Sequence, residues 1–158
     1  HNFTLRHGIL KADGPGACTA LANTGDNLIL EDVVADASPG ACNGEGISAG
    51  NASGTLDNVR AAGGIGIRWT STSSSRNVTM HDVRAEGFTD GISCLASGSS
   101  ITLLVNDSWV QGGLTSITNQ AASCTIQVWS SFLDSEVSGG ATCIAVYNGS
   151  TFYPNTCP

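Results

Sequence analysis

Acidic side chains recur along this chain at intervals that are multiples of roughly 25 residues. Asp32, Asp82 and Asp107 each close a short apolar stretch of the same pattern. If these stretches lie side by side as strands, Asp82 and Asp107 fall about 5 Å apart. That separation suits the two carboxylates of a retaining glycosidase, and the three aspartates together offer oxygen ligands for calcium. The alternative is a solvated strand end whose carboxylates accept hydrogen bonds from nearby backbone amides.

The other ionisable residues do not complete a catalytic motif. The chain has a single lysine, Lys11, and its three histidines, His1, His7 and His81, lie far apart in the sequence. It contains no Gly-x-Ser-x-Gly turn that would present a nucleophilic serine, and no phosphate-binding loop. The sequence therefore favours a protein that is not an enzyme and needs no cofactor, with Asp82 and Asp107 as the catalytic alternative.

A second group of candidates consists of large side chains that we expect on the outer surface, namely Arg60, Arg84, Trp109, Trp129 and Phe132. In the alternating segment 83–85, Arg84 points outward, so Trp109 and Phe132 at equivalent places should point outward too. We expect the same of Trp69. Exposed aromatic rings indicate a sugar-stacking platform, a contact between subunits, or packing beneath a loop, and the subunit contact is favoured.

The elements that position these residues are repeats of one short phrase. It occurs six times, at residues 3–7, 28–32, 54–58, 78–82, 103–107 and 126–130, and its central apolar residues are 23 to 26 positions apart. Each phrase alternates apolar and polar residues, which is typical of a strand. No segment has the apolar spacing of an amphipathic helix. A fixed period of this length without helices predicts an all-β solenoid of about six coils.

One repeat resembles a known family. The segment 78–87 (VTMHDVRAEG), followed by 90–93 (DGIS), is similar to repeats of the right-handed parallel β-helix, or pectin-lyase-like, superfamily. The end of the chain, 141–158, resembles the terminal segment of bacterial and phage-related secreted β-helix proteins. The resemblance implies a right-handed parallel β-helix. It leaves activity open, because this fold carries lyases, hydrolases, tailspikes and adhesins.

Family motifs for catalysis are missing from the chain. Polygalacturonase-like enzymes need Asn-Thr-Asp, Asp-Asp, Gly-His-Gly and Arg-x-Lys, and none of these is present. Pectate-lyase-like enzymes use calcium and a basic residue, and no arginine stands beside a convincing acidic cluster. Tailspikes and fibres on this fold often form trimers side by side. The resemblance therefore implies self-association rather than sugar cleavage.

We expect one domain over residues 1–158, closed by a cap at about 147–158 that includes Tyr147, Phe152 and Tyr153. The chain begins at His1 without an initiator methionine, which indicates a processed product or a fragment with coils ahead of it. An uncapped first coil would dock on a preceding coil, a partner or another copy, and head-to-tail stacking would give a filament.

Six cysteines without a Cys-x-x-Cys motif favour disulfides over a zinc site. Cys18 and Cys42 follow the same Pro-Gly-Ala sequence at equivalent places in neighbouring coils, so they are expected to pair. Cys143 with Cys157 would close the last loop, and elimination leaves Cys94 with Cys124. Free thiols are the alternative. Disulfides indicate an oxidising compartment.

Charge excludes some partners. Thirteen acidic residues against six basic ones give a net charge of -7, which opposes binding to nucleic acid or to an anionic membrane. No apolar run is long enough to cross a bilayer. The sequence predicts an extracellular structural or adhesive module of a fibre, filament or phage-type appendage, at a cell or virion surface, with copies of itself as partners. The alternative is a carbohydrate-active β-helix that binds or cleaves an extracellular polysaccharide.

Overall fold

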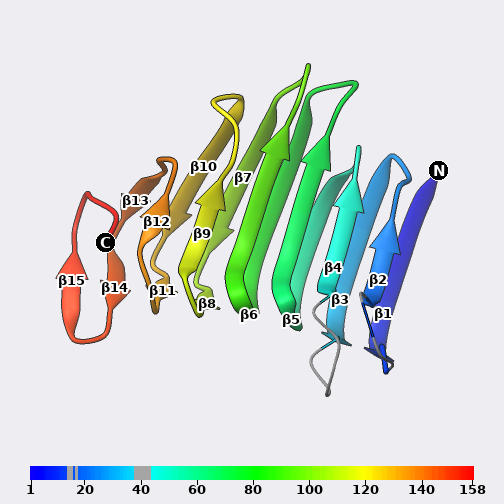
Figure 1. The fold of residues 1–158 in the computed structure, drawn as a ribbon, viewed down its shortest axis with the longest axis horizontal. Coiled ribbons are helices and arrows are strands. Elements are labelled where there is room, and N and C mark those ends of the chain that lie inside the picture. The colour runs from blue at the N-terminus through cyan, green and yellow to red at the C-terminus, as the bar shows by residue number, and fades with distance from the viewer. Residues whose placement is uncertain (14–15, 17, 38–43) are drawn as a thin grey trace.

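The computed structural model describes residues 1–13, 16, 18–37 and 44–158 and shows an all-β solenoid, as predicted (Figure 1). The solenoid has about five turns, where the sequence led us to expect about six coils. The described residues form no helix, and accordingly no helical segment in them could cross a lipid bilayer. The strands are β1 (Asn2–Lys11), β2 (Thr19–Asn23), β3 (Asn27–Asp36), β4 (Glu45–Gly50), β5 (Ser53–Ser71), β6 (Arg76–Ala96), β7 (Ile101–Asn106), β8 (Trp109–Gly112), β9 (Thr115–Asn119), β10 (Cys124–Trp129), β11 (Phe132–Leu133), β12 (Val137–Ser138), β13 (Thr142–Ile144), β14 (Val146–Asn148) and β15 (Thr151–Tyr153).

The repeated phrases lie side by side as successive rungs, one for each turn of the chain. The strands that carry them, β1, β3, β5, β6, β7 and β10, pair in parallel in that order. Their central residues are directly opposite one another, in the series Leu5, Leu30, Leu56, Met80, Val105 and Val128, and the series continues to Cys143 on β13. The six phrases thus bound five turns.

The core is a narrow column of apolar side chains along the solenoid axis. Alternate residues of each rung are buried, and Leu30, Leu56 and Val105 are fully inaccessible. Among the central residues of the six phrases, Leu5 in the first rung is partly exposed and the other five are buried. This alternation fixes the register, because a slip of one residue would move every core side chain to the surface.

Trp69 lies in this core, so the expectation that it faces outward was wrong. Its side chain is fully buried, and its indole Nε1 donates a hydrogen bond of 2.7 Å to the carbonyl oxygen of Ala52. The ring occupies space that a side chain at position 54 would fill, since a Cβ atom built on Gly54 would lie 2.5 Å from Trp69 Cη2. Gly54 replaces the apolar residue that most phrases carry there, which leaves room for the indole.

Two of the three predicted disulfides are present. Cys94 is bonded to Cys124 and Cys143 to Cys157, with Cα–Cα distances of 6.4 and 5.0 Å. The predicted pair of Cys18 with Cys42 lies outside the described residues, since Cys42 is not among them. At the C-terminal end, β15 pairs with β14 in antiparallel orientation, in contrast to the parallel rungs before it.

The Gly54 site gives a test of the packing. Gly54→Ala should lower the free energy of unfolding by about 1–3 kcal/mol, because the added methyl group overpacks the core against Trp69. Gly50→Ala is the matched control, since the nearest atom to its added Cβ would be at 3.5 Å, an ordinary contact. Urea denaturation of both variants measures the difference. Equal stability of the two would show that Trp69 does not depend on the glycine.

Candidate functional site

The residue that ends each phrase adopts a left-handed backbone conformation. Their φ angles lie between 48° and 55°, at His7, Asp32, Asn58, Asp82, Asp107, Ser130 and Ala145. We call this series the corner column. Asp and Asn tolerate this conformation better than most residues, because their short polar side chains can hydrogen-bond locally. The backbone therefore explains why Asp82 and Asp107 recur, without a need for catalysis.

Asp32 does not join the other two aspartates. Its carboxylate lies 2.9 Å from His7 Nδ1 and accepts a hydrogen bond of 2.6 Å from Asn58 Nδ2. The rung of Asn58 separates Asp32 from Asp82. Within the described part of the chain, no group of three or more His, Cys, Asp or Glu residues could hold a metal ion. The geometry therefore does not assemble the three aspartates considered for calcium.

His81 links two carboxylates on neighbouring rungs. Its Nδ1 lies 2.9 Å from Asp57 Oδ1, and its Nε2 lies 3.5 Å from Asp107 Oδ2. The hydrogen bond to Asp57 raises the pKa of His81 above its usual 6.5, and the negative charges of Asp57, Asp107 and Asp82 raise it further. Desolvation lowers this pKa, but by less. The imidazolium form therefore bridges the third to the fifth rung.

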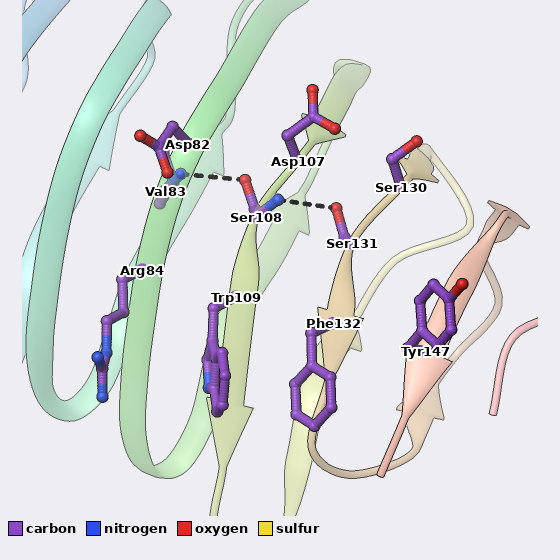
Figure 2. A pocket seen from close by; sticks show the side chains of 10 residues that line it. All are labelled: Asp82, Val83, Arg84, Asp107, Ser108, Trp109, Ser130, Ser131, Phe132 and Tyr147. Carbon is purple, nitrogen blue, oxygen red and sulfur yellow. Dashed lines mark hydrogen bonds between the residues drawn. The ribbon is translucent and has the colours of Figure 1, made fainter. Parts of the chain in front are cut away.

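Most of the predicted site residues meet in one groove, which holds about 350 Å³ (Figure 2). Its lining residues are Asp82, Val83, Arg84, Asp107, Ser108, Trp109, Ser130, Ser131, Phe132 and Tyr147. The corner column forms one wall, and the row that runs from Arg84 to Tyr147 forms the other. Between them, Ser108 Oγ accepts a hydrogen bond of 3.1 Å from Val83 N, and Ser131 Oγ accepts one of 3.1 Å from Ser108 N.

The second wall is a ladder of stacked side chains. Arg84, Trp109, Phe132 and Tyr147 are directly opposite one another on successive rungs. The rings of Trp109 and Phe132 are 4.4 Å apart between centroids, and Arg84 Cζ lies 5.6 Å from the Trp109 ring on the other side. A neighbouring side chain therefore lies on each face of the indole, although Trp109 as a whole is 44% exposed. A sugar would need a free face to stack on Trp109.

The two arginines of the predicted site are held by an acidic residue that the sequence did not single out. Arg60 Nε and Arg84 Nε each donate a hydrogen bond of 2.8 Å to Glu86. Burial would raise the pKa of Glu86, but the hydrogen bonds from Arg60 and Arg84 and their positive charges lower it overall. Arg60 thus belongs to the same ladder, one rung before Arg84.

The ladder continues beyond Phe132 through Tyr147 to Phe152. Tyr147 is opposite Phe132, and the Tyr147 and Phe152 rings are 4.8 Å apart. Trp129 lies outside the groove, on the face that also carries His81 and Asn106. Tyr147 follows Phe132 by only 15 positions, so a search for a period near 25 residues could not place it in this ladder.

The two carboxylates of the groove face water and not the aromatic rings. Both carboxylates are solvent-exposed, and the Asp107 side chain is 60% exposed. A carboxylic acid that serves as a general acid near neutral pH usually lies in an apolar pocket that raises its pKa. Here the aromatic rings lie on the opposite wall, and the aspartates face water.

Comparisons of the chain with protein-family models, curated protein sequences and solved structures found no match. The β-solenoid architecture therefore rests on the structure itself.

The corner column gives a second test. Asp82→Val should lower the free energy of unfolding by about 1–2 kcal/mol, because a β-branched residue is disfavoured in the left-handed conformation. Asp82→Asn keeps a tolerated residue and should leave stability nearly unchanged. Chemical denaturation of the two variants measures the difference. If valine and asparagine gave equal stability, the left-handed corner would not be what selects Asp82.

The His81 bridge predicts a dependence of stability on pH. A pKa raised in the folded state contributes stability that is fully present below the unfolded-state value of about 6.5 and is lost as pH rises through the folded pKa. The wild type should therefore lose more stability than His81→Gln between about pH 5 and about pH 8. Denaturation at both pH values and NMR titration of His81 test this. Parallel stability curves for the two proteins would contradict it.

Proposed function

We propose that this chain is a non-enzymatic structural and adhesive module of an extracellular β-solenoid assembly, and that it self-associates. The carrying observation is the gathering of exposed large apolar side chains on the last rungs. Trp109, Trp129, Ile144, Tyr147 and Phe152 are each between 41% and 48% exposed. Exposed apolar residues that gather on neighbouring rungs of a protein surface indicate an interaction site.

The disulfides support an extracellular location. Two bonds are present among the described residues, and such bonds persist in oxidising environments such as the extracellular space. We also propose that the protein is located at a cell or virion surface. We further propose that it belongs to the right-handed pectin-lyase-like superfamily, which the sequence of residues 78–93 supports.

A carbohydrate-active role is the second candidate, and the groove favours it. A furrow along several rungs, with carboxylates on one wall and rings on the other, has the form of a site for an extended polymer. The covered faces of Trp109 and the exposure of Asp82 and Asp107 weigh against it. The structural role is therefore preferred.

Substitution of the two aspartates separates these functions. Asp82→Asn and Asp107→Asn should leave the self-association of the purified protein unchanged, as measured by sedimentation velocity. Asp134→Asn, an exposed aspartate outside the groove, is the control. Wild-type protein should release no reducing ends from a panel of acidic and neutral polysaccharides. Release that is lost in Asp82→Asn or Asp107→Asn but kept in Asp134→Asn would establish the carbohydrate-active function instead.

A further inference from the structure

The corner column changes character towards the C-terminal end. Its members are Asp or Asn at positions 32, 58, 82 and 107, and then become Ser130 and Ala145. Ala145 keeps a φ angle of 55°, although alanine lacks the polar side chain that makes this conformation acceptable. A residue that is unfavourable for its own backbone indicates that another requirement operates at that position.

The two rows beside the corner also change to large apolar residues, one at the rung of Trp129 and the other one rung earlier, at Trp109. On one side, Asn106 is followed by Trp129 and then Ile144. On the other side, Arg84 is followed by Trp109, Phe132 and Tyr147. We call the resulting surface the C-terminal corner, made up of Trp129, Ser130, Phe132, Ile144, Ala145, Tyr147 and Phe152. The corner column at its centre carries the small side chains of Ser130 and Ala145, and large apolar side chains lie on both sides of it.

The C-terminal corner is also distinguished by charge. The chain carries a net charge of -7, yet no side chain after Glu136 is charged. Residues 28–53 carry four acidic side chains and no basic one, so two copies that met there would bring their carboxylates together, and like charges at close range oppose association. Contact through the C-terminal corner avoids this repulsion and covers apolar surface on both copies.

We propose that two copies of this chain associate through the C-terminal corner about a two-fold axis, an inference that rests on the self-association proposed above. A two-fold contact places the same patch on both sides, so the patch must be complementary to itself. An uncharged apolar surface meets this requirement, whereas a surface of one charge does not. The partner is therefore a second copy of this chain, and the product is a closed dimer.

Head-to-tail stacking of another copy on the C-terminal end is less favourable than the two-fold contact. The last strand, β15, has three residues and is antiparallel to β14, while every earlier rung is parallel. It offers little edge for the ten-residue strand β1 of another copy. The first rung is instead basic, with Arg6 and Lys11 and no acidic residue, so it would favour an acidic partner.

Sedimentation equilibrium over a range of concentrations tests the surface. Wild-type protein should form dimers, and Trp129→Ser or Tyr147→Ser should raise the dimer dissociation constant by roughly tenfold or more. Phe88→Ser and Leu114→Ser are matched controls, because these residues are 80% and 70% exposed and lie outside the C-terminal corner. They should leave the dissociation constant unchanged. Because all four side chains are on the surface, the variants should fold, and the far-ultraviolet circular dichroism spectrum checks this.

A cross-link tests the symmetry. Ser130→Cys is nearly isosteric and lies at the centre of the C-terminal corner, so in a two-fold dimer the new thiol should face its own counterpart. Mild oxidation should yield a covalent dimer, whereas Ser74→Cys, an exposed serine in an earlier rung, should not.

Three outcomes would count against the proposal. A trimer or open filament, or a dimer unaffected by Trp129→Ser and Tyr147→Ser, would overturn the two-fold contact and leave self-association standing. Loss of assembly in Arg6→Glu with no effect of the corner variants would assign the contact to the first rung. A wild-type protein that stays monomeric at every concentration would overturn the proposed self-association itself.

Discussion

The left-handed residue at the end of each phrase is the constraint on which the rest of the solenoid depends. It turns the chain at the same point in every rung, so that the strand before it and the strand after it each pair with their equivalents one turn away. Because the turn is in register, the apolar residues on either side stack into one core. The same repetition places polar and aromatic residues in straight rows on the outside. The core and the candidate site are therefore products of a single backbone feature.

Interactions between rungs follow from this alignment, and they differ along the rod. Near the N-terminus, opposite charges meet across rungs, as between Arg6 and Glu31 at 2.8 Å and between the terminal ammonium group and Asp26 at 2.6 Å. These pairs are exposed and contribute little stability individually. Towards the C-terminus, ring stacking replaces them, as between Trp109 and Phe132. The change from charged to aromatic contacts distinguishes the two halves of the surface.

Much of this arrangement could be predicted from the sequence, because a strict period determines which residues are neighbours. The outward direction of Arg84 implied those of Trp109 and Phe132, and both lie where the alignment placed them. Prediction was wrong where one phrase departs from the others. Trp69 is buried because Gly54 leaves space for it, and that pairing joins residues 15 positions apart that share no repeat position. The left-handed corner was also missed, since Asp and Asn at a strand end are equally expected for chemistry. The position of Tyr147 in the ladder could not be predicted, because the last turn is shorter than the period of about 25 residues.

The unequal lengths of the repeats have a consequence for how such a chain can change. The central residues are 23 to 26 positions apart, yet every phrase keeps its pairing, so extra residues are absorbed in the bends between strands. Duplication of one whole repeat would preserve every row and lengthen the rod by about 4.8 Å. An insertion within a phrase would instead displace one strand from all its neighbours. The length of this protein can therefore change in steps of one repeat. The residues on its outer surface can differ from one rung to the next without a change in the pairing of the strands.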